Sequence, residues 1–337
     1  MFTNGITFTF PNLKRTVEYG LGRVEEELLE QVRGHGNLID PLTGHLAKAG
    51  GKRLRPMLTL LASQLGREKE EVTDQAVKCA LAVELIHLAT LYHDDVMDCA
   101  PIRRGAVAAH EQWSNNLAIL AGDLLFARAS QIISRLPASM IMRYAVTFER
   151  LCAGQMSETF GPEQGVDALE HYLKVLSDKT GSLVATSLCF GAESANLNPE
   201  ILEALEKYGE KIGVAYQLVD DVIDLCSDSD TSGKTPGTDL LEGVDTMPIL
   251  LLRQQLTKGE LDSDGQKLLA DIDSDLSDKD RLQSVIQRLR QNKVVDQTMK
   301  IATDYKNEAL EAIDILPKGE VRKALEAFAK YSVNREK

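Results

Sequence analysis

Helical periodicity runs through nearly the whole sequence of 337 residues. Apolar side chains recur at three- and four-residue steps, the pattern of amphipathic helices, in residues 17–32, 55–66, 74–98, 138–160, 172–179, 182–195, 199–225, 248–256, 281–290 and 321–332. Strand-like alternation is nearly absent. Residues 74–98 are apolar almost all round, which predicts a helix at the centre of a bundle. The sequence therefore predicts an all-α fold.

One domain over residues 1–337 is expected, because the chain has no solenoid period and no low-complexity tract. The polar segment 227–245 is predicted to be a loop or lid, and the acidic segment 257–281 a solvated connection. A hydrophobic content of 43% is typical of a soluble globule. The net charge of −13 argues against nucleic-acid binding, which needs a basic face.

Location in the cytoplasm is expected from the cysteines and from the N-terminus. The cysteines are odd in number, scattered and without a CxxC pair, which favours buried reduced thiols over disulfides or a zinc site: Cys79, Cys99, Cys152, Cys189 and Cys226. The first residues show no secretory signal, and no apolar run approaches the roughly 18 residues of a spanning helix. Peripheral membrane contact for product release stays open.

Two short acidic patterns carry the strongest chemical signal. HDDVMD contains Asp94, Asp95 and Asp98, and VDDVID repeats the spacing with Asp220, Asp221 and Asp224. On a helix, the first and last aspartates of each pattern share one face, ~5.4 Å apart along the axis. Like charges at this spacing cost about 0.2 to 0.5 kcal/mol per pair, so a cation is expected. A lone copy suits a solvated helix end equally well, but two copies in apolar helices favour Mg2+ bound between facing helices.

Basic residues accompany both patterns and predict anion binding. GGKRLRP supplies Lys52, Arg53 and Arg55, and PIRRG supplies Arg103 and Arg104 just after the first aspartates. Arginine and lysine both suit phosphate oxygens. His87 lies two helical turns before Asp94 and shares its face. No catalytic triad, HExxH or GxxxxGK[ST] sequence is present. These features favour a diphosphate that leaves with metal assistance and carries a hydrocarbon tail.

The combined motifs resemble those of the trans-isoprenyl diphosphate synthases, the polyprenyl synthetase family. The resemblance spans about residues 20–330 and rests, in order, on GGKRLRP, IHLATLYHDD with DDVMD, RRG, DKTGSL, YQLVDD with DDVID, and GKTPGTDL. It implies an all-α bundle around a deep central cavity, a homodimer, and head-to-tail addition of isopentenyl diphosphate to an allylic prenyl diphosphate. It also implies Mg2+ as the cofactor, with three ions when substrate is bound.

The resemblance also implies a role for individual residues. Asp94, Asp98 and Asp220 are expected to bind metal directly. Asp95, Asp221 and Asp224 are expected to act through water or by orienting the other ligands, with Asp224 counted in the metal site. The residues implied for isopentenyl diphosphate are Lys52, Arg55, His87 and Arg104, and those implied for the allylic diphosphate are Arg103, Lys179, Thr180, Gln217 and Lys234. Arg103 and Lys179 count among the catalytic groups with Asp94, Asp95, Asp98, Asp220 and Asp221. Many relatives have a lysine where this chain has Val244, so one cationic contact of the lid is expected either to be missing or to be supplied by Lys234.

Product length is expected to depend on the residues four and five positions before Asp94, which form the floor of the cavity in this family. They are Thr90 and Ala89, ~6 to 7.5 Å below Asp94 on a helix. Small side chains there predict a long product of about seven to ten isoprene units, a precursor of quinone tails. The alternative is a geranylgeranyl diphosphate synthase.

Two other functions remain as alternatives. A terpene cyclase usually carries an NSE-type second metal motif and an aromatic pocket, whereas this chain has DDVID and 5% aromatic residues. A subunit of a heteromeric prenyl synthase is the second alternative, but inactive partners generally lose the aspartates that survive here.

Overall fold

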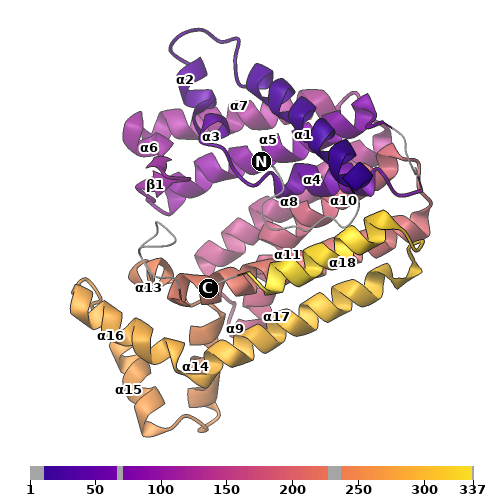
Figure 1. The fold of residues 1–337 in the computed structure, drawn as a ribbon. Coiled ribbons are helices and arrows are strands. Elements are labelled where there is room, and N and C mark those ends of the chain that lie inside the picture. The colour runs from indigo at the N-terminus through magenta and orange to yellow at the C-terminus, as the bar shows by residue number, and fades with distance from the viewer. Residues whose placement is uncertain (1–10, 67–70, 227–236, 336–337) are drawn as a thin grey trace. The chain divides into compact units, whose positions relative to one another are not determined.

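Helix α5, Asp74–Met97, forms from the segment predicted to lie at the centre of a bundle. The Thr73 side chain caps its first turn by accepting from the backbone N of Ala76 at 3.2 Å. In the computed structural model, which describes residues 11–66, 71–226 and 237–335, α5 packs against α1 (Pro11–Gln31), α4 (Leu54–Ala62) and α7 (Asn115–Ile133) (Figure 1). Its apolar circumference is therefore covered on several sides.

The chain divides into two compact units, each described by itself. The first comprises residues 1–149, 183–209 and 312–328, and the second comprises residues 150–182, 210–311 and 329–337. The expectation of a single domain stays a prediction. Besides α1, α4, α5 and α7, the first unit contains the short helices α2 (Asp40–Thr43), α3 (His45–Lys48) and α6 (Ala109–Gln112), the hairpin β1 (Ile102–Arg103) and β2 (Ala106–Val107), and the turn η2 (Ile313–Ile315).

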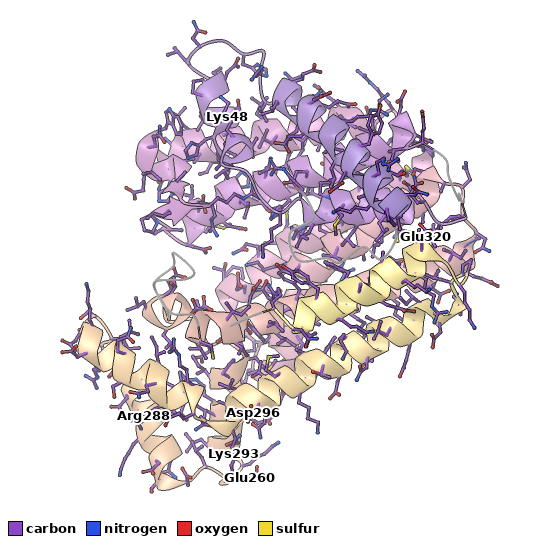
Figure 2. All side chains as sticks on the ribbon, in the orientation of Figure 1. Lys48, Glu260, Arg288, Lys293, Asp296 and Glu320 are labelled. Atoms are coloured by element: carbon purple, nitrogen blue, oxygen red, sulfur yellow. The ribbon has the colours of Figure 1, made fainter. Side chains whose placement is uncertain are left out.

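The second unit contains most of the later helices. They are α9 (Ala168–Leu176), the π-helical turn η1 (Ser177–Gly181), α13 (Thr238–Leu241), α14 (Met247–Thr257), α15 (Ser263–Ile272), α16 (Lys279–Arg290) and nearly all of α17 (Lys293–Ala312). Four further helices run from one unit into the other: α8 (Ala138–Phe160), α10 (Ser182–Ser194), α11 (Pro199–Cys226) and α18 (Glu320–Val333). Exposed charged side chains flank several of these elements (Figure 2): Lys48, Glu260, Lys293, Asp296 and Glu320.

The all-α prediction is confirmed. Within the described ranges, strand structure is limited to the antiparallel pair β1 and β2, in which Ile102 lies opposite Val107. The acidic segment 257–281 is not wholly a connection, because α15 forms inside it and buries Leu268 and Leu269. Of the segment predicted to be a loop or lid, residues 227–236 lie outside the described residues, and α13 occupies part of the rest.

Two other sequence expectations need correction. All five cysteines are free, but Cys99 and Cys152 are exposed rather than buried. By length and composition, α5 and α7 are also apolar enough to cross a membrane, contrary to the expectation that no segment is. In the structure, 72% of the most apolar window of α5 is buried, as expected of a core helix, against 33% for α7.

A buried ion-pair network fixes the loop before α4. Arg53 adopts the left-handed conformation (φ 50°), and its side chain is 2% exposed. Its guanidinium donates to Glu25 Oε2 and Glu84 Oε1, each at 2.9 Å, and to the carbonyl oxygen of Ala47 at 2.9 Å. Glu84 is buried as well, with a side-chain exposure of 2%. Pairing offsets the cost of burying the Arg53 and Glu84 charges away from water. Arg53 is therefore a structural residue of the GGKRLRP segment.

Arg53→Ala should lower the free energy of unfolding by about 3 to 5 kcal/mol, because the buried Glu84 loses its hydrogen-bonded partner and keeps only the longer ion pair with Arg104 Nη2, at 4.0 Å. Chemical denaturation would measure the loss. Arg23→Ala is the matched control: Arg23 also donates to a carboxylate at 2.7 Å, but the Asp74 side chain is 80% exposed, so the expected loss is below about 1 kcal/mol. Equal losses in the two variants would contradict the role given to Arg53.

Candidate active site

The first aspartate pattern lies at the C-terminal end of α5. The backbone N of Asp98 donates to the carbonyl oxygen of Asp94 at 2.8 Å, so the two residues are one helical turn apart. Asp94 is half-buried and Asp98 is exposed. Cys99 then turns the chain out of the helix with a φ of 51°. The two outer carboxylates are thus on one face of the helix end and accessible to a ligand.

Asp95, the middle aspartate, is fully buried. Its Oδ1 accepts from Arg103 Nε, while its Oδ2 is buried without a hydrogen-bond partner in the described part of the chain. Burial raises the pKa of Asp95, and the charge and hydrogen bond of Arg103 oppose that rise. Arg103, which the resemblance assigns to the allylic diphosphate, therefore holds Asp95 in this structure.

The RRG sequence is the turn of the hairpin that follows. Arg104 and Gly105 both have positive φ, 54° and 76°, as a two-residue type I′ turn requires. The Arg104 guanidinium donates to the carbonyl oxygens of Leu46 (3.1 Å) and Gly50. Gly51 has a φ of 146°, which favours glycine, and a Cβ there would lie only 3.0 Å from Arg104 Cζ. The turn thus directs Arg103 to Asp95 and Arg104 to the loop before α4.

The residues predicted to bind isopentenyl diphosphate gather around this loop. Lys52 is exposed, while Arg55, His87 and Arg104 are partly exposed. Burial lowers the pKa of His87 well below its usual value, and the positive charges of Arg55 and Arg104 lower it further. The imidazole is therefore neutral near pH 7 and lies in a strongly cationic environment. Such a cluster can attract a polyphosphate.

The second aspartate pattern lies on α11, in the second unit. Its middle aspartate, Asp221, is 2% exposed. The Tyr172 hydroxyl donates to Asp221 Oδ2 at 2.9 Å, and the backbone N of Met247 lies 3.4 Å from the same oxygen. Burial raises the pKa of Asp221 to about 8, and the hydrogen bond from Tyr172 acts in the opposite direction. The second pattern therefore repeats the arrangement of the first, with a buried middle carboxylate and a side-chain donor.

The outer aspartates of the second pattern are half-buried. Asp220 Oδ1 accepts from Arg335 Nη1 at 2.6 Å, and the Arg335 guanidinium stacks 3.5 Å from the centre of the Tyr216 ring. Asp224 Oδ2 lies 3.4 Å from the backbone N of Asp239. A cation bound at Asp220 would share this carboxylate with Arg335 or displace it.

Lys179 and Thr180 lie in the π-helical turn η1, not in the regular helix that the sequence predicts over residues 172–179. Such turns are frequent at functional sites. Lys179 Nζ pairs with Glu158. Gly181 and Gly213 let the turn approach α11, because a Cβ on Gly213 would lie 2.6 Å from Gly181 Cα. Gln217 is half-buried on α11, and Lys234 lies outside the described residues.

The donor set suits a hard divalent cation that takes part of its coordination from phosphate. All candidate ligands are carboxylates, and no group of three or more potential metal-binding side chains is gathered within residues 11–66, 71–226 and 237–335. Mg2+ typically uses one or two carboxylates together with substrate phosphates and water. Asp94 with Asp98, and Asp220 with Asp224, fit such partial coordination.

Sequence reasoning missed Tyr172, Arg335 and Glu158, which contact predicted site residues. The sequence separations are 49, 115 and 21 residues, so no helical spacing links these pairs. The packing of α9 on α11, the approach of α8 to η1 and the course of the chain after α18 bring these pairs together.

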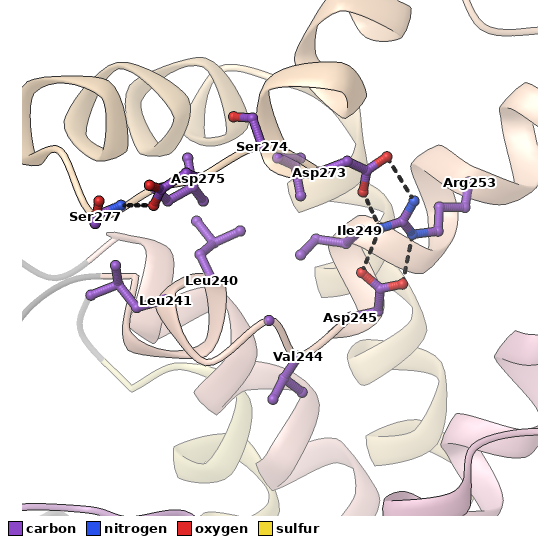
Figure 3. A pocket seen from close by; sticks show the side chains of 13 residues that line it. Leu240, Leu241, Val244, Asp245, Ile249, Arg253, Asp273, Ser274, Asp275 and Ser277 are labelled. Atoms are coloured by element: carbon purple, nitrogen blue, oxygen red, sulfur yellow. Dashed lines mark hydrogen bonds and ion pairs between the residues drawn. The ribbon is translucent and has the colours of Figure 1, made fainter.

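A pocket of about 430 Å³ lies between α13, α14 and the segment after α15 (Figure 3). Val244, the position where many relatives have lysine, is among its lining residues. Arg253 donates to Asp245 at 2.6 Å and to Asp273 at 2.7 Å, and Asp275 accepts from the backbone N of Ser277. Because these charges already have partners, the pocket offers little to a diphosphate.

The predicted product-length residues differ in their surroundings. Ala89 is fully buried, whereas Thr90 is half-buried and its hydroxyl donates to the carbonyl oxygen of His87 at 2.9 Å. A large side chain at Thr90 therefore needs less rearrangement of the core than one at Ala89.

Comparison with known proteins decides the family. The family model described as polyprenyl synthetase matches residues 37–289. The chain belongs to this family. A nonaprenyl diphosphate synthase of Mycobacterium tuberculosis is 40% identical over 320 residues, which are 95% of this chain and 93% of the relative. The prediction of a prenyltransferase is thereby confirmed.

Solved structures of family members agree in fold. A polyprenyl synthase of Caulobacter crescentus, crystallised with calcium and isoprenyl diphosphate, has a TM-score of 0.87 at 30% identity and covers 98% of this chain and 99% of its own. A geranylgeranyl pyrophosphate synthase of Corynebacterium glutamicum, also with calcium and isoprenyl diphosphate, has a TM-score of 0.85 at 37% identity, with 98% and 99% covered. This polyprenyl synthetase family member thus shares its all-α fold with enzymes of different product length.

The lowered pKa of His87 predicts that the free energy of unfolding depends on pH. The unfolded histidine takes up a proton below its ordinary pKa of about 6.5, while the folded one does not. The free energy of unfolding should therefore fall as the pH drops below about 6.5, by up to about 1.4 kcal/mol per pH unit from this group. Urea unfolding at pH 5.5 to 7.5 would measure it. His87→Gln is the control that removes this component, and parallel pH curves for the two proteins would contradict the prediction.

Proposed function

We propose that this chain is an all-trans-polyprenyl diphosphate synthase that makes a long product in the cytoplasm. The observation that carries the proposal is the repeated aspartate pattern, in which the outer carboxylates are accessible and the middle one is buried and held. The substrates are isopentenyl diphosphate and an allylic prenyl diphosphate. The product, of about seven to ten isoprene units, would serve as a precursor of quinone tails, with the small floor residues as its physical basis.

In the proposed reaction, the C–O bond of the allylic diphosphate breaks and leaves an allylic cation and free diphosphate. The double bond of isopentenyl diphosphate attacks the cation, and loss of a proton to the released diphosphate restores a double bond. Lys52, Arg55, His87 and Arg104 bind isopentenyl diphosphate. Arg103, Lys179, Thr180, Gln217 and Lys234 surround the allylic diphosphate, and Arg103 and Lys179 stabilise its negative charge as it leaves.

Mg2+ is the proposed cofactor, with three ions per active site when substrate is bound. When bound, it neutralises charge on the departing diphosphate. Asp94, Asp98 and Asp220 would hold it, with Asp224 as a further ligand through water. Asp95 and Asp221 orient these residues from their buried positions. The crystal structures of two relatives with calcium support a divalent cation, and the all-carboxylate donor set favours the hard ion Mg2+.

A homodimer is the proposed assembly. Helices α7 and α8 leave large apolar side chains exposed within the first unit, namely Leu117, Ile119, Leu120, Ile141, Met142 and Val146. A second copy of the chain would cover this apolar surface, because monomers rarely leave contiguous apolar patches in water.

The purified chain with Mg2+, labelled isopentenyl diphosphate and geranyl, farnesyl or geranylgeranyl diphosphate should give a ladder of products ending at about seven to ten isoprene units. Dephosphorylated products would be separated by size. A ladder that stops at four units would instead indicate a geranylgeranyl diphosphate synthase. Absence of product from every primer would contradict the proposal and favour a subunit of a heteromeric enzyme.

Asp94→Ala and Asp220→Ala provide the controls for that assay. Both should fold but lose turnover, because each removes a proposed metal ligand. Asp264→Ala removes an aspartate whose side chain is 89% exposed on α15 and should retain full activity. Unchanged turnover in the first two variants, or in wild type with excess chelator, would exclude the metal role.

Thr90→Phe should shorten the final product, because an aromatic ring at the cavity floor stops elongation. Ala89→Phe should do the same, with a loss of stability of about 1 to 3 kcal/mol from overpacking at a fully buried site. The same size separation, with thermal unfolding alongside, measures both effects. An unchanged product from both variants would place the floor on another helix.

A further inference from the structure

Tyr172 reaches the middle aspartate of the second pattern from another helix of the second unit. It lies on α9, and its hydroxyl donates to Asp221 Oδ2 at 2.9 Å across 49 residues of sequence. Asp221 lies between Asp220 and Asp224 on α11 and is 2% exposed. A buried carboxyl group needs hydrogen-bond partners, and the backbone N of Met247, which also donates to Oδ2, is farther away at 3.4 Å.

The position of Tyr172 ties two parts of the proposed site together. Helix α9 starts at the cap Asp167, whose side chain accepts from Leu169 N and Glu170 N, and leads directly into the turn η1. Tyr172 precedes Lys179, a residue of that turn, by seven residues, which is about two turns of helix. Its hydrogen bond therefore links the segment that carries Lys179 and Thr180 to the helix that carries the aspartates.

Other contacts hold the turn η1 against α11, so the position of Tyr172 on the preceding helix α9 is fixed independently of its hydroxyl. Arg150 donates to Asp178 Oδ1 at 2.8 Å and also to Glu210 on α11. The backbone of η1 meets α11 closely, since a Cβ on Gly181 would lie 2.9 Å from the carbonyl oxygen of Glu210. Removal of the Tyr172 hydroxyl would leave these contacts in place. It would remove the hydrogen bond that joins α9 to the Asp221 side chain on α11.

From this geometry we propose that Tyr172 is a positioning residue, which holds the Asp221 carboxylate so that Asp220 and Asp224 present their oxygens to divalent cations. The inference rests on the proposed function. Outer-shell partners of metal-binding carboxylates commonly change metal affinity 10- to 100-fold when removed. Tyr172 needs no contact with substrate or cation for this role.

Tyr172→Phe tests the proposal with metal binding as the readout. Binding of Mn2+ in the presence of inorganic diphosphate would be followed by the electron paramagnetic resonance signal of free Mn2+. Tyr172→Phe should weaken Mn2+ binding about 10- to 100-fold, while the KM for isopentenyl diphosphate, whose proposed residues lie in the first unit, stays within about twofold. Unchanged Mn2+ affinity would overturn the positioning role.

Tyr208→Phe is the matched control. Tyr208 is also a buried tyrosine, on α11, but its hydroxyl donates to the backbone carbonyl oxygen of Leu325 at 2.7 Å. Both variants lose one hydrogen bond, so thermal unfolding should show similar losses of stability, and only Tyr172→Phe should lose Mn2+ affinity. Equal weakening of Mn2+ binding in both would mean a general effect on the fold and would overturn the proposal.

Asp221→Asn completes a double-mutant cycle and separates the outcomes. If Tyr172 acts through Asp221, then Tyr172→Phe should change Mn2+ affinity less in the Asp221→Asn background than in wild type. Additive effects would overturn the proposal. Wild type that binds no Mn2+ with diphosphate would overturn the proposed function as well, whereas normal binding by wild type and Tyr172→Phe alike would overturn the positioning role alone.

Discussion

Helix α5 is apolar around its circumference, so other helices have to cover it on every side. In the first unit, α1, α4 and α7 supply that cover, and side chains such as Leu81, Leu85 and Tyr92 are fully buried. The same helix carries Asp94 and Asp95 in its last turn. Burial of the helix therefore brings carboxylates to the edge of an apolar core, and the surrounding polar contacts have to accommodate that charge.

Each aspartate pattern accommodates the charge in the same way. The middle carboxylates, Asp95 and Asp221, point into the protein and accept from Arg103 and Tyr172. The outer ones remain accessible to solvent. A division of this kind lets one helix end both anchor itself and present oxygens to a cation. It also explains why the DD pair is useful, since a single aspartate could not do both.

The basic residues around the loop before α4 also divide into structural and accessible ones. Arg53 is used inside the protein, where it pairs with Glu25 and Glu84, and Arg104 braces the loop through backbone carbonyls. Lys52 and Arg55 are left more exposed. Burial, together with the neighbouring positive charges, lowers the pKa of His87 and keeps it neutral. Neighbouring basic residues in one short motif thus have different roles, which follow from burial rather than residue type.

The sequence by itself determined the helical class, the central helix and both aspartate patterns, because helical periodicity and one-turn spacing are local properties of the chain. It also determined the family. The tertiary structure decided which aspartates are buried and what holds them: the partners Tyr172 and Arg335 lie 49 and 115 residues away from Asp221 and Asp220. It also decided that Lys179 stands in a π-helical turn and that the acidic segment contains α15. Contacts of this range depend on how helices pack, and no local pattern encodes them.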